Sequence, residues 1–136
     1  MEVKYKKTLI LATILIALAI ILGALGAHAL EKVLDPAKLA SFEVAVKYQI
    51  YHGIALLALV SLADKLHFEL KLVFRFLITG VCVFSGSIYM LVFQQFLGVK
   101  LGMVFGPFTP IGGLLMIAGW SVLLVKIVRL KTKSND

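Results

Sequence analysis

The feature that most constrains the fold is an apolar run of 23 residues, from Thr8 to Leu30, that contains no Asp, Glu, Lys or Arg. An α-helix rises about 1.5 Å per residue, so this run is long enough to cross the roughly 30 Å hydrocarbon core of a bilayer. A second charge-free run of 24 residues extends from Phe76 to Val99. The sequence therefore predicts an integral membrane protein.

The composition agrees with this prediction. Hydrophobic residues make up 61% of the 136 residues and charged residues 15%, against about 45–50% and about 25% in soluble domains. The net charge is +7, but the basic residues flank the apolar runs, which indicates membrane topology and no nucleic-acid partner. The only cysteine is Cys82, which excludes an intramolecular disulfide and an all-cysteine metal site. We expect neither a metal nor a cofactor.

We expect an all-α fold in which four transmembrane helices form one bundle and one domain over residues 1–136. The expected spans are about 8–30, 44–63, 76–99 and 110–125. Asp35 and Pro36 form a cap-plus-proline helix start, so an amphipathic interfacial segment over 37–47 should continue into the second span. Thr109 and Pro110 predict a second such start, after a loop over 101–110 that is too rich in glycine and proline to stay helical.

The distribution of basic residues predicts the orientation. With both termini in the cytoplasm, ten Lys and Arg residues lie inside and four outside, so the positive-inside rule favours this topology in a bacterial inner membrane. The N-terminus also imitates a signal peptide, with a small-x-small site at Ala27-His28-Ala29. Its apolar run is longer than is usual for a signal peptide, so we expect an uncleaved anchor.

Two histidines are the main candidates for chemistry. His28 ends the first span, and His52 is expected near the outer end of the second, so both should lie at similar depth. In a functional role, the two histidines would hydrogen-bond to each other, share a proton or hold a ligand. In a structural role, His28 and His52 would each hydrogen-bond to a backbone carbonyl or a tyrosine hydroxyl. A zinc site usually needs three or four ligands, so no metal is assigned to them.

The segment before His52 adds three residues to this candidate ligand or proton site. Glu43 and Lys47 are spaced i,i+4 in the favourable order, so we expect an ion pair on one helix face. Tyr48 fits an aromatic belt at the membrane interface, with anchoring as the alternative to ligand binding.

Small and hydroxyl residues predict the helix-packing seams, because they let backbones approach closely in lipid. Trp120 is expected to pack in the fourth span rather than to recognise a ligand. The residues assigned to packing are Gly23, Gly26, Ser85, Gly86, Tyr89, Gly112 and Gly119.

Four strings occur together in one order along nearly the whole chain. They are Gly23-Ala-Leu-Gly-Ala-His-Ala-Leu30, Phe42-Glu-Val-Ala-Val-Lys-Tyr-Gln-Ile-Tyr-His52, Phe84-Ser-Gly-Ser-Ile-Tyr89 and Thr109-Pro-Ile-Gly-Gly113 followed by Gly119-Trp120. They resemble the YwdK/YgdD family of small bacterial inner-membrane proteins, domain of unknown function 423. Phe42 stands where the family often has tryptophan, and Gly53 where alanine is common. The resemblance implies a four-span fold in the cytoplasmic membrane and transfers no catalytic residue.

Three functional hypotheses follow. The first is a non-enzymatic accessory or assembly component that binds lipid, quinone or a partner protein, within a homo-oligomer or a larger membrane complex. The second is a small oligomeric transporter or channel that uses His28 and His52, since no carboxylate is expected deep in a span. The third is an enzyme acting on a lipid or quinone, with His52 as general base and with Glu43 and Lys47 on the head group.

Overall fold

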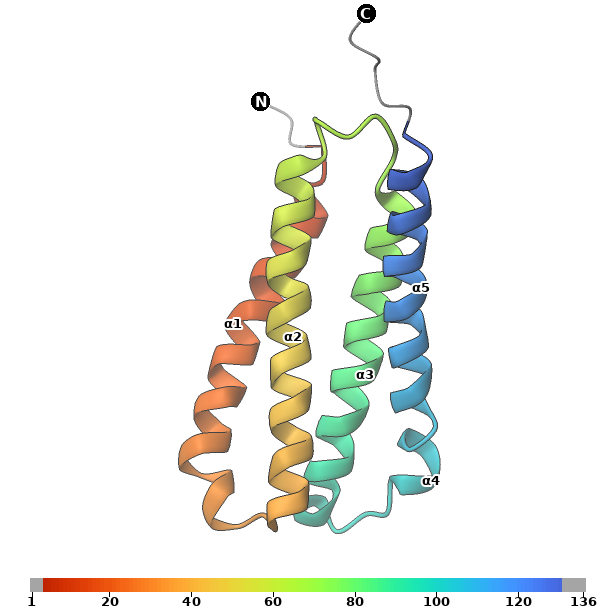
Figure 1. Ribbon diagram of the computed structural model, residues 1–136. Helices are drawn as coiled ribbons and strands as arrows, with labels where there is room; N and C mark the ends of the chain where they lie inside the picture. Colours follow the sequence, from red (N-terminus) through yellow and green to blue (C-terminus); the bar gives the residue numbers. More distant parts are fainter. Residues whose placement is uncertain (1–3, 131–136) are drawn as a thin grey trace, which may run out of the picture.

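The computed structural model describes residues 4–130, which form four long helices lying side by side (Figure 1). A short 3-10 helix, η1 (Leu30–Lys32), and one helical turn, α4 (Gly102–Phe105), lie in the connections, and residues 4–130 contain no strand. The predicted all-α, four-span fold is confirmed. The long helices are α1 (Lys6–His28), α2 (Pro36–Leu62), α3 (Lys71–Leu97) and α5 (Phe108–Val128).

The helices alternate in direction along the bundle (Figure 1). The starts of α1 and α3 and the end of α5 lie at one end, which we call the N-terminal surface. The starts of α2 and α5 lie at the other end, which we call the opposite surface. At 1.5 Å per residue, the 27 residues of α2 or α3 span about 40 Å, so these helices cross the hydrocarbon core and reach both interfaces.

The most extensive packing joins α1 to α2, α2 to α3 and α3 to α5. The α3–α5 seam depends on glycine. A Cβ atom on Gly80 would lie 2.7 Å from the backbone nitrogen of Met116, and one on Gly112 would collide with the backbone of Phe84. The two helices therefore approach so closely that neither position has room for a methyl group, as is typical of small-residue seams in membranes.

The small residues of α1 form an internal seam with α2. Thr8, Ala12, Ala19 and Gly26 are buried, and a Cβ on Gly26 would lie 3.0 Å from the ring of Phe42. These four residues therefore pack within the chain and are not available to contact another subunit.

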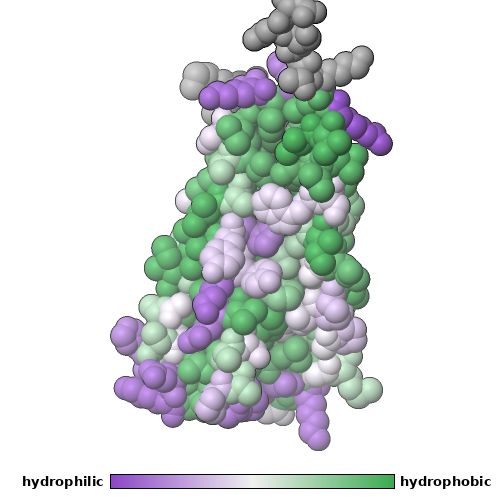
Figure 2. All heavy atoms as spheres, in the orientation of Figure 1, coloured by the Kyte–Doolittle hydropathy of each residue, from purple (hydrophilic) through white to green (hydrophobic). Residues whose placement is uncertain are grey.

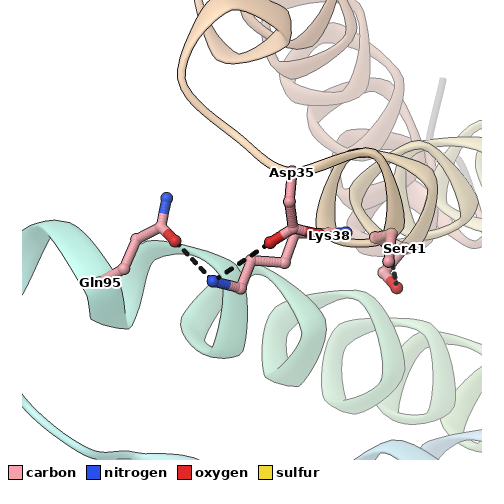
Figure 3. Close-up of polar contacts among 5 residues, drawn as sticks. Asp35, Lys38, Ser41 and Gln95 are labelled. Carbon is pink, nitrogen blue, oxygen red and sulfur yellow. Dashed lines mark hydrogen bonds and ion pairs between the residues drawn. The ribbon is translucent and has the colours of Figure 1, made fainter.

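Asp35 caps α2, as its sequence position predicts. The Asp35 carboxylate accepts a hydrogen bond from the backbone N–H of Lys38 at 2.9 Å, and Pro36 begins the helix. This bond holds the pKa of Asp35 below its ordinary value. The Lys38 ammonium also donates to Gln95 Oε1 at 2.7 Å, which ties the start of α2 to the end of α3 (Figure 3). Residues 37–47 belong to the same unbroken helix as the rest of the second span.

The connection between α3 and α5 differs from the prediction. The segment expected to be non-helical contains the single turn α4, and α5 begins at Phe108 without a side-chain cap. The prediction that Thr109 caps the fourth span was wrong. Its hydroxyl lies 2.7 Å from the hydroxyl of Ser87, so it joins α5 to α3 instead.

Candidate functional site

A layer of polar side chains crosses the middle of the bundle. It separates one apolar cluster, which includes Leu56 and Leu77, from another, which includes Phe42 and Ile88. Gln49, the central residue of α2, is 4% exposed, and His52 is 7% exposed. Buried polar groups are costly in a membrane unless they find partners. Within the described chain, every buried side-chain nitrogen and oxygen has one.

Gln49 connects α2 to both of its neighbours. Its amide nitrogen donates to the backbone carbonyl of Leu15 on α1 at 2.8 Å, and its amide oxygen accepts from the Tyr89 hydroxyl on α3 at 2.7 Å. Ser85 on α3 donates to the backbone carbonyl of Ala45 on α2 at 2.8 Å. These bonds join three helices at the level where apolar packing is interrupted.

His52 connects α2 to α5. Its Nδ1 lies 2.9 Å from the carbonyl oxygen of Tyr48, and the indole N–H of Trp120 donates to its Nε2 at 3.2 Å. A carbonyl oxygen only accepts and an indole N–H only donates, so both bonds form when the ring is neutral with its proton on Nδ1. In a protonated imidazolium ring, Nε2 would also carry a hydrogen, so its N–H and the indole N–H of Trp120 would be two donors facing each other. The arrangement therefore fixes one tautomer and holds His52 as a structural bridge.

A second group of polar residues faces outward from α2 and forms what we call the α2 polar face. It consists of Glu43, Lys47, Tyr48 and Tyr51, all exposed, with Tyr51 at 60%. Figure 2 shows a strip of hydrophilic and pale side chains that rises from the opposite surface into the middle of an otherwise apolar face. With a core of about 30 Å centred on the 27 residues of α2, Glu43 and Lys47 lie within it, about 10 Å and about 16 Å along the helix from Pro36.

The structure does not bring His28 and His52 together. His28 is the exposed last residue of α1. His52 lies near the middle of α2, because the whole helix from Pro36 crosses the membrane, and its neighbour Gly53 faces Ala12 and Ile16 of α1. Ile16 is about 18 Å along α1 from His28. The expectation of similar depth was wrong.

Two further expectations differ from the structure. Glu43 and Lys47 form no ion pair, since the pairs within 4.0 Å over residues 4–130 are Lys4–Glu69 and Lys38–Asp35. Exposed ion pairs gain little energy, so two long side chains are free to separate. Gly86 was expected to pack, but a Cβ there would meet nothing within 4 Å. Gly23 faces Val46, and Gly119 faces Leu77.

The candidate metal ligands do not converge. No group of three or more His, Cys, Asp and Glu residues with the spacing to hold a metal ion occurs among residues 4–130. Cys82 is a free, exposed thiol on α3.

A third polar group lies at the N-terminal surface. Tyr5 donates to Glu69 at 3.0 Å and accepts from the backbone N–H of Leu70 at the start of α3. Lys4 pairs with the same carboxylate at 2.9 Å. The hydrogen bonds from Lys4 and Tyr5 hold the pKa of Glu69 below its ordinary value, and the bond to Glu69 raises the pKa of Lys4. This group fastens the start of α1 to the start of α3.

Gln49 and the partner of Trp120 were not predicted from the sequence. Gln49 has a detectable pattern, because it shares a helical face with Phe42, Ala45 and Leu56, which are all buried. A glutamine in the middle of such a face indicates an interhelical hydrogen bond. The partner of Trp120 is 68 residues away in sequence, and local spacing carries no information about it.

Comparisons with known proteins identify the chain's relatives. A family model described as "Protein of unknown function (DUF423)" matches residues 22–113. The chain is 37% identical to UPF0382 membrane protein SSP2132 of Staphylococcus saprophyticus. The 120 aligned residues cover 88% of this chain and 95% of the relative. The chain is 43% identical over 109 residues to UPF0382 membrane protein C1782.12c of Schizosaccharomyces pombe, covering 79% and 90%.

A third relative is the UPF0382 inner membrane protein YgdD of Escherichia coli, 32% identical over 126 residues and 92% of each chain. No solved structure matches the chain. The names of these relatives agree with the four apolar helices, so the chain is a multi-pass membrane protein. The resemblance predicted from its four sequence strings is confirmed, and the chain belongs to the DUF423 family of membrane proteins.

Proposed function

We propose that this chain is a non-enzymatic accessory or assembly component of the bacterial inner membrane, and that it binds a second membrane-spanning protein through the α2 polar face. The observation that carries the proposal is the exposure of Glu43 and Lys47 on a helix that crosses the bilayer. Charged side chains at hydrocarbon depth are expensive when they face lipid. A protein neighbour with polar groups removes that cost.

The composition of the face supports a protein partner. Tyr48 and Tyr51 are 41% and 60% exposed, and Trp120, which contacts His52, is 41% exposed. Tyrosine and tryptophan are enriched at protein interfaces because each has a large apolar body and a polar end. Glu43 and Lys47 have no ion-pair partner among residues 4–130, so each would take an opposite charge or an amide from the partner. An acid and a base on the same face also favour one register of docking.

The hydrogen bonds of His52 support this proposal over the two alternatives. A proton-carrying transporter or channel needs His52 to gain and lose a proton, and a lipid- or quinone-acting enzyme needs it as a free general base. Here Nδ1 faces a carbonyl and Nε2 accepts from Trp120, so neither nitrogen has a lone pair directed at a ligand. His28 lies at another depth and does not complete a relay.

The orientation belongs to the same proposal. The distribution of basic residues favours both termini in the cytoplasm. The N-terminal surface then faces the cytoplasm, and the α2 polar face lies in the outer half of the membrane.

The proposal is tested by extracting the chain with its surrounding lipid into polymer nanodiscs and weighing the particles by native mass spectrometry. We expect one additional membrane protein at fixed stoichiometry. The Glu43→Gln/Lys47→Gln variant should lose it, because the substitution removes both charges and preserves side-chain size.

The matched control is Glu31→Gln/Lys32→Gln, which also removes one acid and one base. Both residues are exposed and lie at the opposite surface, in η1 outside the polar face. The control should keep the additional protein. Wild-type particles that contain a monomer, or only copies of this chain, would contradict the proposal. Equal loss from both variants would contradict the assignment to the α2 polar face.

A further inference from the structure

A large cavity opens between α1 and α3 at the N-terminal surface. Its volume is about 890 Å³, within the range of natural small-molecule sites. Its lining comes from the first turns of α1, with the residues just before it, and from the first turns of α3. The cavity is separate from the α2 polar face, which lies toward the opposite surface.

The mouth of the cavity is strongly cationic. Its basic lining residues are Lys4, Lys6, Lys7, Lys71 and Arg75. Lys4 is paired with Glu69. Over residues 4–130, no acidic side chain lies within 4.0 Å of the other four. Glu69 is close enough to Lys71 to interact with it electrostatically, but four cations in one lining still outnumber this single carboxylate and favour an anion.

The backbone strengthens this attraction. α1 and α3 both begin at the mouth, and neither first turn contains an acidic residue. The N-terminus of each helix carries a partial positive charge and N–H groups without intrahelical partners. The anion-binding groups therefore come from the starts of two helices and from four side chains, Lys6, Lys7, Lys71 and Arg75, at the same end of the cavity.

The deeper lining is apolar. Leu9 and Leu11 of α1 and Phe74 and Ile78 of α3 line the cavity, with Thr8 and Thr79 as its uncharged polar members there. The lining continues to Thr79, about 12 Å along α3 from Lys71. An acyl chain would bury apolar surface against these side chains, whereas a free phosphate or a soluble metabolite has no apolar surface of this length to bury.

From the cationic mouth and the apolar depth together, we infer that this cavity is a binding site for one anionic glycerophospholipid. The phosphate lies among Lys6, Lys71 and Arg75, and the glycerol and the first part of the acyl chains lie between α1 and α3. The inference goes beyond the proposed function, because it concerns a different face and needs no protein partner.

The test uses the purified full-length chain, in which no partner is present, so its outcome is independent of the proposed function. Phosphatidylglycerol and phosphatidylcholine with identical acyl chains are titrated in neutral detergent and followed by native mass spectrometry. We expect phosphatidylglycerol to bind at least about tenfold more tightly. Lys71→Gln/Arg75→Gln should weaken its binding about tenfold or more and leave phosphatidylcholine unchanged.

The matched control is Lys126→Gln/Arg129→Gln. It removes two cations at the same membrane surface, from α5 and its C-cap, outside the cavity. We expect less than about a twofold change. Equal weakening by both pairs of substitutions would show attraction to the basic surface in general and would overturn the site. Equal affinity for the two lipids would overturn it as well.

A second variant separates a lipid from a free phosphate. Thr79 is exposed and lines the deep end of the cavity, so Thr79→Trp should fill the space taken by the acyl chains without disturbing the core. We expect it to weaken phosphatidylglycerol binding and to leave binding of glycerol phosphate unchanged. Glycerol phosphate should bind at least about tenfold more weakly than the lipid. Equal affinity for both would overturn the lipid assignment in favour of a phosphate site.

Discussion

The indole nitrogen of Trp120 lies 3.2 Å from Nε2 of His52 and joins α5 to α2 in the middle of the membrane. The broad packing contacts run from α1 to α2, from α2 to α3 and from α3 to α5. This hydrogen bond therefore links two helices that are not neighbours in that series. It also occupies the histidine nitrogen that a transporter or an enzyme would use.

The first prediction concerns this bond. Trp120→Phe removes the donor and keeps an aromatic ring, and His52→Ala removes the acceptor. Interhelical hydrogen bonds in membranes are worth about 0.6 kcal/mol on average, with a maximum of about 1.7. A double-mutant cycle, measured as unfolding free energies in micelles, should give a coupling energy in this range. If the two substitutions simply add, the bond contributes nothing.

The second prediction concerns Gln49. Gln49→Leu leaves the half-buried Tyr89 hydroxyl without its acceptor, which costs about 1–3 kcal/mol. Adding Tyr89→Phe removes the stranded hydroxyl. The double variant should therefore be more stable than Gln49→Leu alone, as measured by thermal unfolding in the same detergent. A double variant that is less stable than the single one would mean that the hydroxyl has another partner.

The third prediction concerns the glycine seam between α3 and α5. Gly112→Ala places a methyl group against the Phe84 backbone, which has no flexible end to move, so we expect a loss of about 1–3 kcal/mol. Gly86→Ala is the control, because a Cβ there meets nothing within 4 Å. It should be neutral or stabilise the helix by up to about 1 kcal/mol. Similar losses of stability at both positions would contradict the close packing of α3 against α5 at Gly112.

The fourth prediction is a pH dependence at the N-terminal surface. The pKa of Glu69 is held below its ordinary value by hydrogen bonds from Lys4 and Tyr5. The unfolded chain therefore binds the proton more readily, so stability from this carboxylate is present above its ordinary pKa and is lost as the pH falls through the folded value. The melting temperature of the wild type should fall more steeply below about pH 4 than that of Glu69→Gln. The same dependence of melting temperature on pH in both proteins would contradict the stabilising role of the Glu69 carboxylate.

The sequence predicted what depends on local properties of the chain. Charge-free runs located the helices because only a long apolar helix fits a bilayer, and Asp35 with Pro36 located the start of α2. The relation of His52 to Trp120 was beyond local reasoning, since it depends on how α5 packs against α3. Glu43 and Lys47 had suitable spacing, but exposed side chains are too free for spacing alone to join them.

The most direct test of the central claim is site-specific photo-crosslinking in living cells. A benzophenone side chain replaces Tyr51 on the α2 polar face, and in a control chain it replaces Ile21 of α1, which is 64% exposed to the same membrane. The account predicts one discrete adduct with a different membrane protein from position 51 and none from position 21. No protein adduct at position 51, or the same adducts at both positions, would contradict it.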